Sequence, residues 1–261
     1  MNVSLEPQSE YEYRGLMASA WDLLRGDTAN WPDRPFYREI IRANGEPALD
    51  VGCGTGRLLL DYQAQGLDVD GVDNSPEMLA ICREKALARG LDVRLFHQSM
   101  PALDINRRYR TIFVPSSSFQ LVTDRAQADE TLRRLYRHLQ DGGTLVMSIM
   151  DVSRGADGAW QLVKECVRPG DGLTIRRWGR STYDASTQLE STEDRYEVMR
   201  DGKVVESEHH SRSPATRNYS LPQITQLMQS AGFAQVSAVS GFTHAPAVVG
   251  EALFCVIGTR P

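Results

Sequence analysis

Apolar positions in the middle of the chain follow two periods in turn, one typical of strands and one typical of helices. Short apolar runs predict strands at 48–51, 68–73, 93–96, 111–114 and 144–150. Helical spacing between them predicts helices at 57–65, 76–88 and 125–139, the last closed by Asp141-Gly142-Gly143. Strands that alternate with helices indicate a parallel sheet covered by helices on both faces.

The pattern changes near residue 152, where polar, β-rich runs follow one another without helices between them. These runs cover 173–183, 188–200 and 203–212, and Asp201-Gly202 between the last two is a strong hairpin signal. We expect three or four antiparallel strands here. Alternation resumes with a helix at 221–230 and strands at 234–239 and 253–258.

Three units follow from this pattern. Residues 1–45 form an amino-terminal helical cap, with a helical apolar and aromatic pattern over 10–25 and a second short helix to about 42. Residues 46–151 and 220–261 form the sheet domain, and residues 152–219 form an insertion. A chain of 261 residues is long enough to bury a sizeable core.

Composition narrows the possible partners. A net charge of −5 provides no basic surface for nucleic acid. The amino terminus lacks a signal peptide pattern, and no apolar run reaches membrane-spanning length. Four scattered cysteines without a C-x-x-C pair fit reduced thiols. We therefore expect a cytoplasmic protein that binds neither nucleic acid nor membrane, and the oligomeric state stays open.

The stretch from Asp50 to Gly56 carries the main chemical signal. Glycines at 52, 54 and 56 follow a predicted strand and precede a helix, which allows a tight turn and close approach of a ligand. Asp73 ends the next strand, where a carboxylate can bind ribose hydroxyls. The spacing G-x-G-x-G, with Arg57 where a dinucleotide fingerprint would continue, disfavours a nicotinamide cofactor. Cys53 fits this turn as a small residue rather than as a nucleophile.

Asp50, the glycine turn and Asp73 resemble the donor-binding motifs of the class I, Rossmann-like S-adenosyl-L-methionine (SAM)-dependent methyltransferases. The resemblance spans about 46–150 and 221–258. The amino-terminal segment and the insertion resemble a small-molecule group that includes glycine and amino-sugar N-methyltransferases. This implies an α/β fold: a doubly wound, mostly parallel seven-stranded sheet, last strand antiparallel, with an inserted antiparallel β lid. It also implies SAM as the methyl donor and a small-molecule acceptor.

The resemblance assigns the donor site by position. Asp50, Gly52 and Gly54 match the loop around the methionine moiety, Asp73 matches the ribose acid, and later segments match positions that flank adenine or face the methyl group. The full expected set is Asp50, Gly52, Cys53, Gly54, Gly56, Asp73, Asn74, Met78, Ser99, Met100, Pro115, Ser117 and Gln120. Ser99 departs from the usual Asp, so we expect the adenine contact to be either weaker or moved to a backbone group or Gln98.

The loop after the fourth strand reads Pro115-Ser116-Ser117 and lacks the Asn/Asp-Pro-Pro-Tyr signature of enzymes that methylate nucleobase amines or glutamine. Ser117 and Gln120 are therefore expected in a wall beside the methyl group of a small-molecule site. Methyl transfer from a sulfonium needs mainly alignment of the reactants, so no catalytic motif is compulsory. The sequence shows no cluster with metal-ligand spacing, and we expect a metal-free reaction.

Candidate catalytic residues are Tyr11 and Tyr13 in the amino-terminal segment and His210 on a lid strand. His209 and His210 are adjacent, so only one of them can face inward. Five lid arginines could bind an acidic acceptor or be solvated: Arg176, Arg177, Arg180, Arg212 and Arg217. The resemblance to the small-molecule group favours nitrogen as the acceptor atom. Two alternatives remain open from the sequence: a non-catalytic SAM-binding protein that acts through a partner, and a nicotinamide-dependent oxidoreductase.

Overall fold

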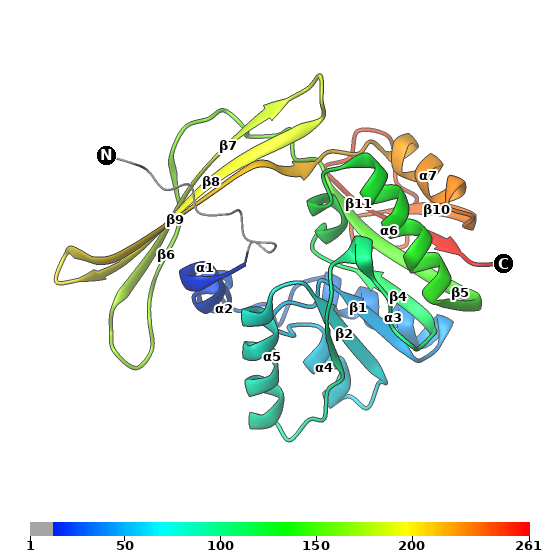
Figure 1. Cartoon of the computed structure of the whole chain (residues 1–261), viewed down its shortest axis with the longest axis horizontal. Helices are drawn as coiled ribbons and strands as arrows, with labels where there is room; N and C mark the ends of the chain where they lie inside the picture. Colours follow the sequence, from blue (N-terminus) through cyan, green and yellow to red (C-terminus); the bar gives the residue numbers. More distant parts are fainter. Residues whose placement is uncertain (1–12) are drawn as a thin grey trace.

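The computed structural model describes residues 13–261, which form two sheets (Figure 1). The larger sheet has the strand order β10-β11-β5-β4-β1-β2-β3. Its seven strands are β1 (Ala48–Val51), β2 (Val69–Asp73), β3 (Leu95–His97), β4 (Tyr109–Val114), β5 (Leu139–Met150), β10 (Ala234–Ser240) and β11 (Leu253–Thr259). Only β11 runs antiparallel to its neighbours. The predicted fold class is confirmed, including its antiparallel last strand.

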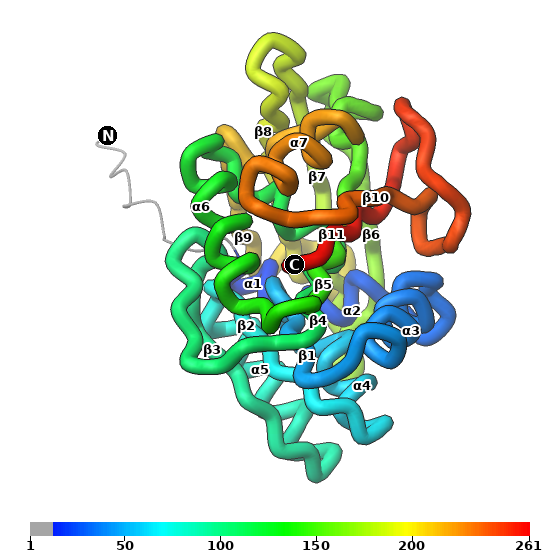
Figure 2. The backbone as a smooth tube through the Cα atoms, turned by 90° about the vertical axis from the view of Figure 1, so that its right-hand side faces the viewer, coloured from blue at the N-terminus to red at the C-terminus, as the bar shows by residue number. Residues whose placement is uncertain are grey.

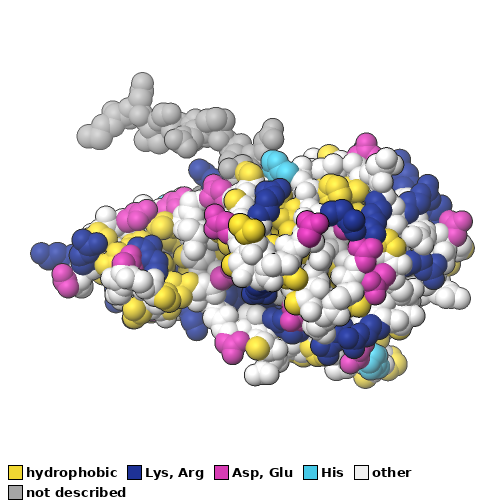
Figure 3. All heavy atoms as spheres, turned by 90° about the horizontal axis from the view of Figure 1, so that it is seen from below, with side chains coloured by type: hydrophobic (Ala, Val, Ile, Leu, Met, Phe, Trp, Pro, Cys, Tyr) yellow, Lys and Arg dark blue, Asp and Glu magenta, His cyan; other side chains and the backbone are white. Residues whose placement is uncertain are grey.

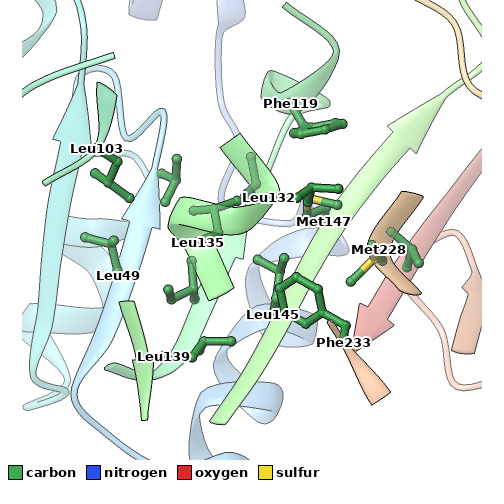
Figure 4. Close-up of a cluster of buried hydrophobic side chains, with 14 of the residues drawn as sticks. Leu49, Leu103, Phe119, Leu132, Leu135, Leu139, Leu145, Met147, Met228 and Phe233 are labelled. Atoms are coloured by element: carbon green, nitrogen blue, oxygen red, sulfur yellow. The ribbon is translucent and has the colours of Figure 1, made fainter. Parts of the chain in front are cut away.

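Helices cover both faces of this sheet, and Figure 2 shows α6 on one side of the strands and α3 on the other. The helices are α1 (Gly15–Ser19), α2 (Trp21–Arg25), α3 (Asp33–Asn44), α4 (Leu59–Ala64), α5 (Pro76–Ala88), α6 (Arg125–His138) and α7 (Leu221–Ser230), with 3₁₀ turns η1 (Met100–Ala102) and η2 (Ser118–Leu121). Ile112 and Val114 of β4 belong to the cluster around α6 and α7 (Figure 4), whereas Phe113 belongs to the cluster around α3 and α4. Alternate residues of a buried strand thus serve opposite faces.

The second sheet has four antiparallel strands in the order β6-β7-β8-β9. They are β6 (Gln161–Val167), β7 (Thr174–Asp184), β8 (Leu189–Arg200) and β9 (Lys203–Arg217). The expected antiparallel strands are confirmed, and β6 is the strand that the sequence pattern did not locate. Asp201 and Gly202 form the β8–β9 turn with φ of 50° and 74°, which explains the strong hairpin signal.

Two predicted boundaries were wrong. The helical pattern over 10–25 is interrupted at Ala20, whose ψ of −1° separates α1 from α2. Leu16 and Met17 of α1 pack on Tyr196 of the second sheet, so tertiary contact overrides one continuous helix. The run 141–143 lies inside β5 instead of following a helix end, because β5 already begins at Leu139 beside β4.

No helix among residues 13–261 is long and apolar enough to cross a membrane. The four cysteines are free in the structure, as expected for reduced thiols.

Candidate functional site

The glycine turn connects β1 to α4 at the carboxyl edge of the larger sheet. Gly54 has a φ of 53°, and its N–H donates to Asp73 Oδ2 at 2.8 Å. A Cβ at this position would meet nothing within 4 Å, so a ligand has room to approach the backbone. A Cβ on Gly56 would lie 2.5 Å from Cys82 Sγ. Gly54 therefore opens the turn to a ligand, while Gly56 lets α4 pack closely on α5.

Asp73 ends β2 beside this turn. Its Oδ1 accepts the N–H of Ser75 at 2.8 Å. Burial raises the pKa of Asp73, whereas the hydrogen bonds from the backbone N–H groups of Ser75 and Gly54 lower it, and burial has the larger effect. A carboxylate offers about four acceptor positions, and backbone N–H groups of Gly54 and Ser75 occupy two of them. The remaining positions fit a pair of hydroxyl donors such as those of a ribose.

Asp50 and Cys53 are both buried at the turn. Burial raises the pKa of Asp50 to about 8, opposed by the nearby charge of Arg57. Among the described residues, Asp50 Oδ1 has no hydrogen-bond partner. Burial also raises the pKa of the Cys53 thiol well above its usual value. A thiol with a raised pKa is a poor nucleophile.

A cavity of about 1060 Å³ lies between the carboxyl edge of the larger sheet and the second sheet. Ten residues of the predicted site line it: Tyr13, Gly52, Cys53, Gly54, Asp73, Asn74, Met78, Ser99, Met100 and His210. Five others do not: Asp50, Gly56, Pro115, Ser117 and Gln120. Tyr11 lies outside the described residues.

Ser116 and Ser118, rather than Ser117 and Gln120, form the cavity wall after β4. Ser116 and Ser117 have φ of 55° and 58°, in the left-handed region that side chains other than glycine rarely adopt. These two residues reverse the chain, and the Ser117 N–H donates to Ser148 Oγ at 3.0 Å. The side chain of Gln120 is fully buried away from the cavity.

The side-chain amide of Gln98 is hydrogen-bonded to the backbone of Asp104. Its Nε2 donates to the Asp104 carbonyl at 3.0 Å, and its Oε1 accepts the Asp104 N–H at 2.8 Å. The nitrogen and the oxygen of the Gln98 amide are thus both bonded to the backbone of Asp104. Asn74, Gln98 and Ser99 all line the cavity.

The sequence analysis missed Arg25. Its guanidinium lies 5.1 Å from the ring of Trp21 and 5.3 Å from that of Trp31, and it donates to Ser116 Oγ at 3.2 Å. Burial and the charge of Arg57 lower its pKa. No carboxylate pairs with Arg25 in the part of the chain that the structure describes. The guanidinium is a cation in the cavity wall, suited to an anionic group of a ligand.

The second sheet supplies the opposite wall. His210 of β9 and Asp194 of β8 are direct cross-strand neighbours, and both line the cavity. His210 Nε2 lies 3.2 Å from Glu208 Oε1, and its ring meets that of Tyr196 edge-on at 5.6 Å. Arg177 Nε donates to Asp194 Oδ1 at 2.8 Å. This wall combines an imidazole with acidic groups.

Residues 13–261 contain no group of three or more His, Cys, Asp or Glu side chains that could hold a metal ion. The site consists of a glycine turn, the strand-end acid Asp73, Arg25 between two tryptophan rings and a polar wall on the second sheet.

Known proteins share both the turn and the whole fold. A model of the methyltransferase domain matches residues 48–143. A demethylmenaquinone methyltransferase of Thermus thermophilus is 37% identical over 159 residues, which cover 56% of this chain and 67% of the relative. A protein named as a methyltransferase from Geobacillus sp. (strain WCH70) is 27% identical over 220 residues, 84% of this chain and 87% of the relative.

Solved structures extend the similarity to the second sheet. The methyltransferase CcbJ of Streptomyces caelestis has a TM-score of 0.76 and 22% identity, covering 94% of this chain and 96% of that one. An amino pentose methyltransferase from Micromonospora echinaspora, solved with SAM bound, has a TM-score of 0.70 and 22% identity, covering 97% and 99%.

The chain belongs to the class I SAM-dependent methyltransferases. It is an enzyme that transfers a methyl group from SAM.

Proposed function

We propose that this enzyme methylates a nitrogen atom of a small molecule, without a metal, chiefly by aligning the acceptor with the donor methyl group. One observation carries the proposal: the cavity runs from the glycine turn to a polar wall on the second sheet. Such an enclosed space suits a compact molecule better than a protein or nucleic acid surface. The amino pentose methyltransferase and a sugar N-methyltransferase from Streptoalloteichus share this architecture, which favours nitrogen.

The donor contacts we propose follow the lining of the cavity. The Asp73 carboxylate accepts the ribose hydroxyls, and Gly52 and Gly54 present backbone to the methionine moiety. Asn74, Met78, Ser99 and Met100 surround adenine. Arg25 holds the methionine carboxylate, which adds a contact to the set expected from the sequence. Bound SAM supplies a methyl carbon activated by its positive sulfur.

The acceptor nitrogen attacks with its lone pair, forming the bond to the methyl carbon as the carbon–sulfur bond breaks. The electron pair of that bond stays on sulfur, which becomes neutral. The methylated nitrogen then loses a proton, and we assign His210 as the base that takes it, beside Glu208. Tyr13, which lines the cavity near Trp21, helps to orient the acceptor. Tyr11 stays a candidate from the sequence for the same task.

Donor with a ¹³C-labelled methyl group and a pool of small amines and alcohols tests this function. We expect a labelled N-methyl product, which carbon NMR distinguishes from an O-methyl product by chemical shift, and an unchanged rate in the presence of EDTA. A labelled O-methyl product would refute the choice of nitrogen. Loss of turnover in EDTA that magnesium restores would refute the metal-free reaction.

The strand that carries His210 offers a matched control for the proposed base. His210→Gln should lower the rate by about 10²-fold or more, the usual range for loss of a general base. His209→Gln changes the neighbouring residue, which also lines the cavity but whose side chain is 51% exposed and contacts Glu193, and it should lower the rate far less. Equal rates for the two variants would remove His210 from the mechanism.

We also keep the three predicted units as a proposal: 1–45 as a cap, 46–151 with 220–261 as the SAM-binding domain, and 152–219 as the acceptor unit. Packing of α1 on the second sheet supports a cap that contacts the acceptor unit. Exchange of 152–219 for the same unit of a related enzyme should change the acceptor and preserve donor binding. Loss of donor binding in a folded chimera would contradict this division.

A further inference from the structure

Gln120 lies in η2 with its side chain fully buried, outside the cavity wall. Its Nε2 donates to the Met150 carbonyl at 2.9 Å and to the Arg217 carbonyl at 3.0 Å. Its Oε1 accepts the Met150 N–H at 2.8 Å. One amide therefore makes three hydrogen bonds to two backbone positions that are 67 residues apart in the sequence (217 − 150).

These two positions are the ends of the connection between the sheets. Met150 is the last residue of β5, after which the chain leaves the larger sheet, and Arg217 is the last residue of β9, after which it returns. Figure 1 shows both crossings on the same side of the molecule. Gln120 thus holds the outgoing and the returning strand together.

Neighbouring side chains reinforce the junction. Arg217 is 8% exposed, and its guanidinium donates to the carbonyls of Thr123 at 2.6 Å and Thr187 at 3.0 Å. Asn218 contacts Asp151 Oδ1 at 3.3 Å. The junction therefore joins η2, the end of β5 and the β7–β8 turn through directional hydrogen bonds.

The same short segment also forms part of the cavity. Ser116 and Ser118 line it immediately before Gln120, and Ser117 is tied to Ser148 of β5. A shift at Gln120 would move the loop that faces the methyl group and the second sheet at once. Gln120 couples the two walls because it is bonded to the end of β9 and because Ser118 of the loop lies two residues before it in the chain.

From this arrangement we infer that Gln120 is a positioning residue that sets the orientation of the second sheet relative to the carboxyl edge of the larger sheet. It keeps the acceptor wall at a fixed separation from the donor wall without touching either ligand. This role extends beyond methyl transfer itself and does not depend on which acceptor is used.

Electron–electron distance measurements between two spin labels test the inference directly. One label replaces Ser207, exposed on β9, and the other replaces Glu84, exposed on α5, in a background where the partly exposed Cys166 is Ser. We expect a narrow distance distribution in this parent and a broadened or shifted one in Gln120→Met, which keeps the length of the side chain and removes its hydrogen bonds. An unchanged distribution in Gln120→Met would overturn the proposal.

Two further variants separate positioning from stability. Gln120→Glu keeps the shape and the acceptor for the Met150 N–H and loses both donated bonds, so it should also broaden the distribution, and it serves if Gln120→Met does not fold. Met228→Ala removes a buried side chain of α7 that makes none of the hydrogen bonds of the junction, and it should lower the unfolding temperature while leaving the distribution narrow. Equal broadening in Met228→Ala would show general loosening and refute a specific role.

S-adenosylhomocysteine titrated by calorimetry supplies the second measurement. The residues that line the donor end of the cavity are untouched in Gln120→Met, so we expect its affinity to stay within about threefold of the parent. Methyl transfer to a pooled set of amines should fall about tenfold or more, because small misplacements of reacting groups are costly. A rate that fell only as far as donor affinity would contradict positioning.

Discussion

The cavity has two walls that present different kinds of groups to a ligand. The turn wall (Gly52 to Thr55 with Asp73) offers backbone N–H groups and a carboxylate already held by two of them. The strand wall (Asp194, His210 and Arg212) offers side chains spaced along two β-strands. The contacts of the turn wall come mainly from the backbone, so they depend on the fold and little on the side chains. The contacts of the strand wall come from side chains, which can be substituted without altering the fold.

The charges that support the two walls differ in burial. Arg57 and Asp33, beside the turn wall, form an ion pair with each other, and their side chains are only 9% and 6% exposed. On the outer face of the second sheet, Arg180 and Glu193 are paired with 39% and 30% exposure. Figure 3 shows charged and hydrophobic side chains intermixed over the narrow end of the molecule on the left, where the second sheet lies. Buried and exposed ion pairs should respond very differently to mutation.

The largest expected effect is on the buried pair. Arg57→Ala leaves the Asp33 carboxylate buried without its partner, which should lower the free energy of unfolding by about 3–5 kcal/mol. Urea unfolding of the purified variant measures this loss. A decrease below about 1 kcal/mol, the size typical of exposed pairs, would show that the turn wall is not supported by this pair.

The next effect concerns donor affinity. Asp73→Ala removes the proposed contact to two hydroxyls and should weaken binding of S-adenosylhomocysteine by about 1.5–3 kcal/mol, as for hydrogen bonds to a charged group. Calorimetry compares it with Asp92→Ala, which changes an exposed acid before β3. Equal affinity in the two variants would remove Asp73 from the donor site.

The third effect is the pH dependence of stability due to Asp50. The folded protein binds its proton with a pKa of about 8, above the usual value of an unfolded Asp, so the stabilisation is complete below about pH 4 and is lost as pH rises toward 8. The slope contributed by one group is at most about 1.4 kcal/mol per pH unit. Asp50→Asn should flatten the curve of unfolding free energy between pH 5 and about 8. An identical slope in the variant would contradict the assignment.

The smallest effect is on the second sheet. A double-mutant cycle with Arg180→Gln and Glu193→Gln should give a coupling energy of about 0.2–1 kcal/mol, because solvent screens this exposed pair. Thermal or urea unfolding of the four proteins provides the measurement. A coupling energy above about 2 kcal/mol would abolish the contrast between the two regions.

The turn wall could be predicted far better than the strand wall. Glycine spacing and a strand-end acid are local signals, so the turn from Gly52 to Gly54 and Asp73 were expected at one site, and both line the cavity. The direction of the loop after β4 was harder to predict. It depends on left-handed φ values at Ser116 and Ser117, and the sequence has no glycine there to indicate such values. For that reason Gln120 was expected beside the methyl group and lies instead at the junction of the two sheets.

Contacts made only in the folded chain account for the other differences. Arg25 lies between Trp21 of α2 and Trp31 of the following loop, a cage that no periodicity reveals. The alternation rule allowed only one of His209 and His210 to face inward, but the choice depended on strand register. The register sets His210 opposite Asp194, leaving its side chain 9% exposed against 51% for its neighbour.

The junction at Gln120 ties together the two points where the chain passes between the sheets. The chain leaves the larger sheet after Met150 and returns to it after Arg217, and the Gln120 amide is bonded to both residues. The second sheet is therefore joined to the larger sheet at one place. We expect that the residues between Asp151 and Asn218 can be exchanged while the seven strands of the larger sheet keep their order. Exchange of the chain between these two positions is therefore expected to alter the strand wall and to leave the turn wall in place.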